Sequence, residues 1–506
     1  MELRIAAAGD LSAEAVTAIG YERAGVRLQP AVLRAVDERR SAVRAALATA
    51  EDVYGVGTGA GARAGVAVPA GEAERHQAHL LLARAVGSAP WLPAAEARML
   101  LAVRLRGFLQ GQPGVSAALC EALAARLRRD LVPAVPRTAI GTAGEVIPLA
   151  HAFQTLLGTG LVLGEAAPGG GPAGTLDAGE ALRASGLEPY LPGAKEGIAL
   201  LAGGPAAVAL ALGRLRAGRR LARLLLLGAA AAVDALRAPL EPYTRAVAAL
   251  AGDGLADDVA ARLEALLEGS APQRLRHQAP VSFRVVLQVQ VHLERTLSRL
   301  AEDADRSLAA VDDSPTLVDG RFASTGAFHD VALSAGMDGL AVALTHAAEV
   351  AAQRTHRLLD GRWSGLTDQL TSTPSGASTG LIVVHKRAVG AVHELRRLAA
   401  PTSVGLADTS LGQEDAQTFV FESAERLRRM EQLVTDVVTC ELLCVRQSWA
   451  LRAAADPGAR PARGLEDLAS ALATAVPPVL EDRPLGEDLG RVRSVLDRLL
   501  PPDPQL

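Results

Sequence analysis

A stretch from Ala416 to Ala455 contains no glycine or proline, and it constrains the fold of this chain more than any other feature. A helix of about 40 residues would extend about 60 Å at a rise of 1.5 Å per residue. Such a helix is longer than a lone globular domain needs, so we expect it to pack in a long bundle, within or between subunits. Residues at helical steps of three and four are Leu427, Met430, Val434, Val437 and then Glu441 or Cys444.

Two further segments have the same spacing, and they run from Arg284 to Leu308 and from Asp330 to Leu359. Apolar and polar residues alternate from Val285 to Val291 as they do in a strand, but the helical step resumes at Leu293 and continues to Leu300, so we predict a helix here. Aromatic residues make up only 3% of the chain, and packing by alanine and leucine favours close helix–helix approach. We therefore predict an all-α fold with a long central helix bundle and a loop-rich N-terminal region.

Segments rich in glycine and proline indicate where the chain changes direction or region. Residues 166–174 are expected to form a flexible loop, and residues 456–464 are typical of a linker to a small terminal helical region. The expected regions are therefore an N-terminal region, a central long-helix bundle and a C-terminal helical tail, over residues 1–200, 201–455 and 456–506.

Composition excludes several classes of protein. The chain has 52 Lys+Arg against 56 Asp+Glu, a net charge of -4, and the absence of a basic block argues against a nucleic-acid partner. The apolar run over residues 224–233 is closed by Arg223 and Asp234 and is too short to span a membrane. Arg4 and Asp10 interrupt any signal-peptide pattern. An odd set of three cysteines without metal-ligand spacing fits a reducing compartment. We expect a cytoplasmic protein without a membrane or metal partner.

Two short motifs carry chemical information. Tyr54 heads the loop Tyr-Gly-Val-Gly-Thr-Gly, whose glycines allow the backbone to approach a ligand or to turn sharply. The second motif runs from Gly141 to His151 and includes a Pro-Leu-Ala-His segment. In this order and at this spacing, the motifs resemble the histidine and phenylalanine ammonia-lyases, which are aromatic amino acid lyases. Weaker family landmarks follow in the correct order: Gly186 to Pro189, Lys195 to Gly197, Ser282 to Arg284, Phe328-His329, Gln413 to Asp415 and Glu441 to Cys444.

The resemblance implies a largely helical fold, a homotetramer with active sites shared between subunits, and a small carboxylate-bearing substrate. Tyr54 matches the family's general base, Glu414 matches a carboxylate on the amino-group side, and Arg284 matches the arginine that pairs with the substrate carboxylate. A planar guanidinium suits that last task because it binds a carboxylate through two hydrogen bonds. Further substrate-binding positions are expected at His79, Arg84, Phe328 and Lys386. For Arg84 and Lys386, a role as solvated surface charges stays open.

The tripeptide Thr142-Ala143-Gly144 departs from the family pattern. The lyases that this chain resembles build an electrophile, the methylidene-imidazolone (MIO) group, from an internal Ala-Ser-Gly. The backbone cyclises, and the serine hydroxyl is lost as water. Ala143 has no leaving group at Cβ, and Thr142 cannot substitute because the dehydrated carbon must belong to the residue inside the new ring. We therefore expect this chain to lack the group and to have no other cofactor.

Other positions of the family's site have changed as well. Ala202 stands where the family has an asparagine, and Val281 stands where it has a second tyrosine. These losses favour an enzyme that works without MIO, by base-catalysed elimination, isomerisation or cyclisation, in bacterial specialised metabolism. The alternative is a non-catalytic homologue that acts as a partner or scaffold protein. Retention of Tyr54, Arg284 and Glu414 favours the enzyme, and Ala143 argues against a conventional ammonia-lyase.

The tripeptide gives the first testable prediction. The intact mass of the purified protein should equal the mass of the unmodified chain, because Ala143 cannot be dehydrated. Mass spectrometry checks this, and an absorbance scan in the range of the family's prosthetic group is the control. A mass lower by one or two molecules of water would contradict the prediction.

Overall fold

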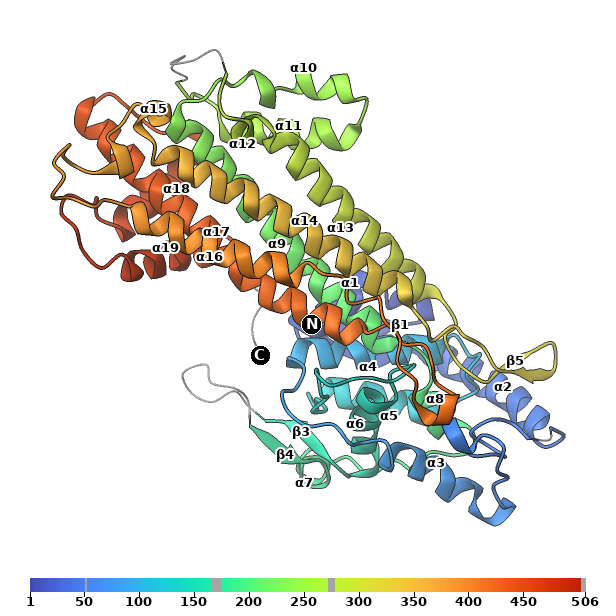
Figure 1. Ribbon diagram of the computed structural model, residues 1–506. Coiled ribbons are helices and arrows are strands. Elements are labelled where there is room, and N and C mark those ends of the chain that lie inside the picture. The colour runs from blue at the N-terminus through green and yellow to red at the C-terminus, as the bar shows by residue number, and fades with distance from the viewer. Residues whose placement is uncertain (51, 165–173, 272–277, 502–506) are drawn as a thin grey trace.

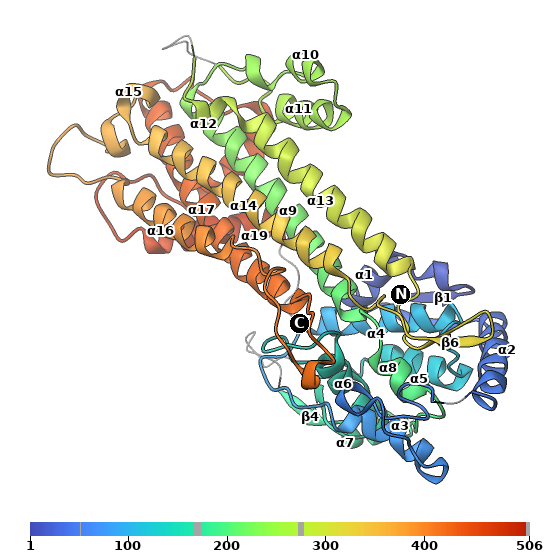
Figure 2. The same cartoon turned by 45° about the vertical axis from the view of Figure 1, so that its right-hand side comes forward.

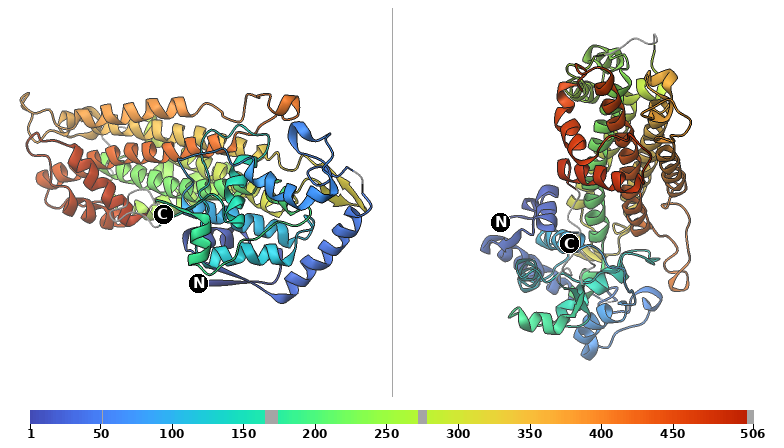
Figure 3. Two further views of the ribbon diagram at one scale, coloured as in Figure 1. Left: turned by 90° about the horizontal axis from the view of Figure 1, so that it is seen from below. Right: turned by 90° about the vertical axis from the view of Figure 1, so that its left-hand side faces the viewer.

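The computed structural model describes residues 1–50, 52–164, 174–271 and 278–501. The molecule is elongated, with a bundle of long helices at one end and a region of shorter helices and loops at the other (Figures 1 and 2). The same division is visible in Figure 3, where the blue and teal N-terminal region lies at one end of the bundle. The loop expected at residues 166–174 lies outside the described residues except for Gly174.

Long helices pack along one another in the bundle, as the sequence predicted. The central helix α9 contacts α4, α13, α14 and α17, and α16 packs against α14 and α17. The bounds of the bundle helices are α9 Pro205–Leu236, α13 Val286–Ala309, α14 Val331–Leu358, α16 Ile382–Leu398 and α17 Val420–Ala455. The prediction of an all-α fold with a long central bundle is confirmed.

The ends of two predicted helices differ from the sequence expectation. The long helix begins at Val420 rather than near Ala416, because Phe419 has a left-handed backbone with φ 50°. The helix expected from Arg284 onward is divided at Val285, whose ψ of 8° separates the short α12 (Val281–Arg284) from α13. The segment that alternates like a strand is helical, as predicted.

The N-terminal region combines short helices with two small sheets. Strands β1 (Glu2–Ile5) and β2 (Gly25–Leu28) pair in parallel, and β3 (Leu161–Leu163) pairs antiparallel with β4 (Thr175–Asp177). The helices of this region are α1 Ala13–Tyr21, α2 Pro30–Leu47, α3 Ala73–Leu82, α4 Ala94–Leu109, α5 Ala117–Arg128, α6 Val146–Gln154, α7 Ala178–Ala184 and α8 Glu196–Leu201.

Smaller elements cover the ends of the bundle. The hairpin β5–β6 lies near α2, and α10, α11 and α15 lie at the opposite end (Figures 1 and 2). The C-terminal helices α18 and α19 pack on each other, and α19 packs on α17. Their bounds are β5 Thr316–Val318, β6 Arg321–Ala323, α10 Arg245–Ala248, α11 Gly254–Leu266, α15 Gly361–Ser364, α18 Glu466–Ala475 and α19 Gly486–Leu499.

Helix α9 is buried along nearly its whole length. A Cβ added at Gly218 would lie 2.7 Å from Leu297 Cδ2, so a larger residue there would have to displace that leucine of α13. Two stretches, residues 196–236 and 331–358, are apolar and long enough to cross a membrane by length and composition alone. The most apolar windows of these stretches are 94% and 61% buried inside the protein, which is typical of core helices.

A buried ion pair joins two helices of the bundle. Arg354 on α14 donates to both carboxylate oxygens of Glu441 on α17, at 2.6 and 3.1 Å, and both side chains are at most 4% exposed. Burial raises the pKa of Glu441, whereas the Arg354 guanidinium opposes that shift. Removing one member of a buried ion pair leaves an uncompensated charge in the core, whereas replacing both with apolar residues is often nearly neutral.

Substitution Arg354→Met should therefore destabilise the protein by ~3–5 kcal/mol. The double variant Arg354→Met/Glu441→Leu should recover most of that loss, because no charge remains buried. Urea unfolding followed by circular dichroism measures both. Equal stability of the single variant and the original chain would show that this pair does not hold α14 on α17.

Candidate active site

The loop that carries Tyr54 is fixed against α3 and α8. Tyr54 Oη accepts a hydrogen bond from the Gly61 N–H at 2.8 Å. Gln77 on α3 donates to the Gly55 carbonyl oxygen at 2.8 Å and accepts from the Ile198 N–H at 3.2 Å. Gly55 has φ +69°, and a Cβ there would lie 2.8 Å from Ile198 Cγ1. The loop therefore holds the half-buried Tyr54 in a defined position.

Arg84 and Glu414 lie beside Tyr54 in the same subunit. A Cβ added at Gly61, the residue that donates to the Tyr54 hydroxyl, would lie 3.5 Å from Glu414 Oε1. Burial lowers the pKa of the Arg84 guanidinium, and interactions with Tyr54 and Glu414 oppose that shift. Three residues predicted from well-separated parts of the sequence therefore form one cluster, which we call the Tyr54 cluster. It contains a hydroxyl, a cation and a carboxylate.

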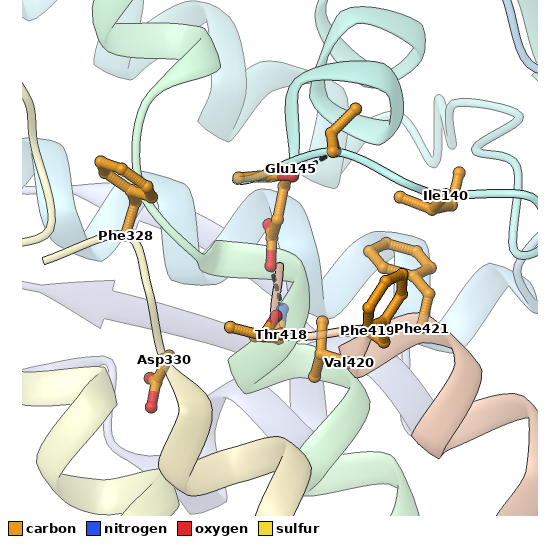
Figure 4. Close-up of a pocket in the computed structure, with 11 residues that line it drawn as sticks. Ile140, Glu145, Phe328, Asp330, Thr418, Phe419, Val420 and Phe421 are labelled. Atoms are coloured by element: carbon orange, nitrogen blue, oxygen red, sulfur yellow. Dashed lines mark hydrogen bonds between the residues drawn. The ribbon is translucent and has the colours of Figure 1, made fainter. Parts of the chain in front are cut away.

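The tripeptide lies beside a second group of predicted residues. Thr142 Oγ1 donates to the Gly144 carbonyl oxygen, and a Cβ at Gly144 would lie 3.6 Å from Phe328 Cδ2. Figure 4 shows Phe328 on one side of Glu145 and Phe419 on the other. The cavity at this position is about 10 Å³ within one subunit, which is room for about one water molecule.

Glu145 is a feature that the sequence analysis missed. Its carboxylate accepts hydrogen bonds from the Ala206 and Ala207 N–H groups at 2.7 and 2.5 Å, and so it caps the N-terminus of α9. Burial raises the pKa of Glu145 to about 8, although the two N–H donors and Arg104 oppose the shift. No local sequence pattern predicts this cap, because Glu145 and the Ala206 N–H that it accepts from lie 61 residues apart in the chain.

Buried polar contacts also position the segment before α9. The Lys195 ammonium lies 2.6 Å from Asp313 Oδ2, and both side chains are 1% exposed. Asp312 Oδ2 accepts from the Gly204 N–H at 2.8 Å. Gly203 has φ +86°, and a Cβ there would lie 2.1 Å from Asp312 Oδ2, so only glycine fits. These contacts hold the backbone that follows Ala202 in place.

The residues at the tripeptide do not fit the methylidene-imidazolone group. Ala143 is half-buried beside the pocket, and its side chain is a methyl group that cannot lose water. Within the described ranges, no group of three or more His, Cys, Asp or Glu side chains could hold a metal ion.

Arg284 and Lys386 are not brought to the Tyr54 cluster within one subunit. Arg284 ends α12, which lies at the opposite end of the molecule from α3 and α6 (Figures 1 and 2). Lys386 is exposed in the first turns of α16, next to His385, whose ring stacks on His356 near the end of α14 at 4.5 Å. The side chain of Arg284 is half-buried, and its Nε has no hydrogen-bond partner in the part of the chain that is described.

His79 and Arg84 line a larger cavity, of about 530 Å³, between the Tyr54 loop and α3. His79 Nε2 accepts a hydrogen bond from Arg75 Nε at 3.4 Å.

The site residues expected from the sequence divide into two sets. His79, Arg84, Tyr54, Glu414, Phe328 and the tripeptide lie at one end of the molecule, whereas Arg284 and Lys386 lie at the other.

Comparisons with known proteins agree with this architecture. A sequence profile described as aromatic amino acid lyase matches residues 11–473. Histidine ammonia-lyase of Anaeromyxobacter dehalogenans (strain 2CP-C) is 32% identical over 497 residues, which cover 96% of this chain and 97% of that protein. The crystal structure of histidine ammonia-lyase from Trypanosoma cruzi has a TM-score of 0.85 at 26% identity, covering 98% of this chain and 94% of that one.

One further solved structure is similar to this chain in fold alone. Ergothionase from Treponema denticola, described as an ergothioneine degrading enzyme and solved in complex with desmethyl-ergothioneine sulfonic acid, has a TM-score of 0.91 at 20% identity. The similarity covers 98% of this chain and 99% of that one.

The raised pKa of Glu145 predicts a pH dependence of stability. A carboxyl group whose pKa is raised on folding binds its proton more tightly in the folded state. Its stabilising contribution is therefore complete below about pH 4.5 and is lost as the pH rises through about 8. Between these values, Glu145→Gln should gain stability relative to the original chain by up to ~1.4 kcal/mol per pH unit.

Melting temperatures measured from pH 5 to pH 9 check this prediction. The exposed Glu74→Gln is the matched control and should show no such trend. A stability difference between Glu145→Gln and the original chain that stays constant across this range would contradict the assignment.

Proposed function

We propose the following function from the premise that the chain belongs to the aromatic amino acid lyase family. The protein is an enzyme that works without the methylidene-imidazolone group. It catalyses a base-driven elimination, isomerisation or cyclisation on a small substrate that bears a carboxylate. The observation that supports this proposal is the Tyr54 cluster, which keeps a tyrosine hydroxyl, a cation and a carboxylate together, whereas the tripeptide Thr142-Ala143-Gly144 lacks the serine precursor of the electrophile.

Tyr54 is the general base in this proposal. The Gly61 N–H donates to its hydroxyl oxygen, and Arg84 places a positive charge beside it. Both contacts are made at or beside the oxygen that accepts the proton. The Tyr54 oxygen takes a proton from an acidic C–H of the substrate, and the electron pair of that bond expels a leaving group, shifts a double bond or closes a ring. Glu414 lies where it can contact the group that departs or is displaced.

The missing electrophile restricts the substrate. Ammonia is a poor leaving group unless its amine is activated, and no residue at the tripeptide can supply that activation. General base catalysis contributes about 10²–10⁴-fold, which suffices for an activated substrate. We therefore infer a substrate with an acidic C–H or a good leaving group already in place. Ergothioneine, whose amino nitrogen carries three methyl groups, belongs in the panel of test substrates because its amine leaves without further activation.

The active site is completed by a second subunit. Arg284 and Lys386 lie at the opposite end of the protomer from Tyr54, so they reach a Tyr54 cluster only if subunits pack with their ends exchanged. We propose a homotetramer in which the partner subunit's Arg284 binds the substrate carboxylate. Phe328 of the protomer that supplies Tyr54 covers the side of the substrate that faces the tripeptide. The proposed setting is the cytoplasm and bacterial specialised metabolism, since the chain has bacterial relatives but a changed catalytic group.

Substitution Tyr54→Phe should lower kcat by about 10²-fold or more, with little change in substrate affinity, because it removes only the proton acceptor. Steady-state kinetics on the substrate found in the panel measures this. The matched control is Tyr190→Phe, which loses hydrogen bonds to Ser116 and Glu196 away from the cluster. If Tyr54→Phe leaves turnover unchanged, the protein is better explained as a non-catalytic partner or scaffold.

Substitution Arg284→Lys should raise KM and leave kcat much less affected. A lysine keeps the charge but cannot form the paired hydrogen bonds to a carboxylate, and ~1–3 kcal/mol of binding free energy should be lost.

Light scattering on the same sample should give the mass of a tetramer. A monomer that binds substrate with full affinity would contradict the shared site.

A further inference from the structure

The cavity beside the Tyr54 cluster is larger than a small amino acid requires. Its volume of about 530 Å³ lies within the range of pockets that hold extended ligands. One wall is the loop that follows Tyr54, from Gly59 to Pro69, and the other is α3 with Arg84 just beyond its end. The cavity therefore meets the Tyr54 cluster at Arg84.

The lining of this cavity is strongly cationic. Three arginines line it, Arg63, Arg75 and Arg84, together with His76 and His79. Glu72 is the one carboxylate among the described lining residues. Within the described part of the chain, none of the three arginines has a carboxylate at ion-pair distance. By contrast, arginines inside the bundle, such as Arg214, are matched by glutamates.

A histidine in the same wall has an unused polar atom. His76 Nε2 is buried and has no hydrogen-bond partner among the described residues. Burial lowers the pKa of His76, a hydrogen bond with the Thr58 backbone opposes that shift, and Arg84 and His79 act in the same direction as burial. An anion in the cavity would offset the charges of the arginines and would accept a hydrogen bond from His76 Nε2 when that nitrogen carries a proton. Arginine side chains bind carboxylates and phosphates through charge-assisted hydrogen bonds, which are stronger than neutral ones.

We propose that this cavity is a subsite for a second oxyanion of the substrate. The substrate is then at least a dianion: one carboxylate binds at the partner subunit's Arg284, and a carboxylate or phosphate at the other end binds Arg63, Arg75 and His76. The proposal rests on the proposed function for the role of Tyr54, but the cavity and its charges exist in one protomer. A substrate of this class would place its reacting carbon between the two anionic ends.

Isothermal titration calorimetry on the full-length protein at low salt tests the subsite. The probes are inorganic phosphate and succinate, with acetate as the monoanion. Phosphate or succinate should bind more tightly than acetate, and whichever binds more tightly identifies the oxyanion. The variant Arg63→Gln/Arg75→Gln should weaken that binding by about 10-fold or more, because charge-assisted hydrogen bonds are lost. The matched control Arg44→Gln, an exposed position on α2, should bind as the original chain does.

The proposal fails if the double variant binds phosphate and succinate as tightly as the original chain, or if neither probe binds better than acetate. The variant Tyr54→Phe separates this test from that of the proposed function. If Tyr54→Phe keeps full turnover but phosphate binding still depends on Arg63 and Arg75, the base assignment is wrong and the subsite stands. If Tyr54→Phe abolishes turnover but phosphate binding does not depend on Arg63 and Arg75, the base assignment stands and the subsite proposal is wrong.

Discussion

Burial of α9 along nearly its whole length is the constraint on which the rest of the structure depends. A helix surrounded by α4, α13, α14 and α17 has to be lined with small and apolar residues, and its N-terminal N–H groups need an acceptor inside the protein. Glu145 supplies that acceptor, and Glu96 and Glu431 neutralise Arg214 on the same helix. Because Glu145 directly follows the tripeptide, the capping of α9 fixes the position of that tripeptide.

The bundle could be predicted from the sequence because its helices are long and uninterrupted. The periodicity of the segment ending at Ala455 and its lack of glycine and proline predict a helix. The observed helix is shorter than predicted because Phe419 has a left-handed backbone. Contacts between distant segments could not be predicted in this way. The Glu145 cap and the Lys195–Asp313 pair join residues 61 and 118 positions apart, and neither carboxylate belongs to a recognisable pattern.

The candidate site could be predicted in part, and only through the family resemblance. Tyr54, Arg84 and Glu414 do meet, although no spacing rule relates them. Arg284 does not meet them within one chain, since its helix lies at the other end of the bundle (Figure 1). In the proposed function, subunits share the site: one end of a protomer supplies the base, and the other end of its partner supplies the anchor for the carboxylate. Ala143 offers no leaving group for the electrophile, whereas Tyr54 and Arg284 are both present in the chain.

A crystal structure of the assembled protein with a bound carboxylate substrate or inhibitor would test the central claim most directly. The account predicts density for the ligand between Tyr54 and the partner subunit's Arg284, with the acidic carbon facing the Tyr54 hydroxyl and an uncyclised backbone from Thr142 to Gly144. Density for a five-membered ring at the tripeptide, or a ligand bound away from Tyr54, would contradict it.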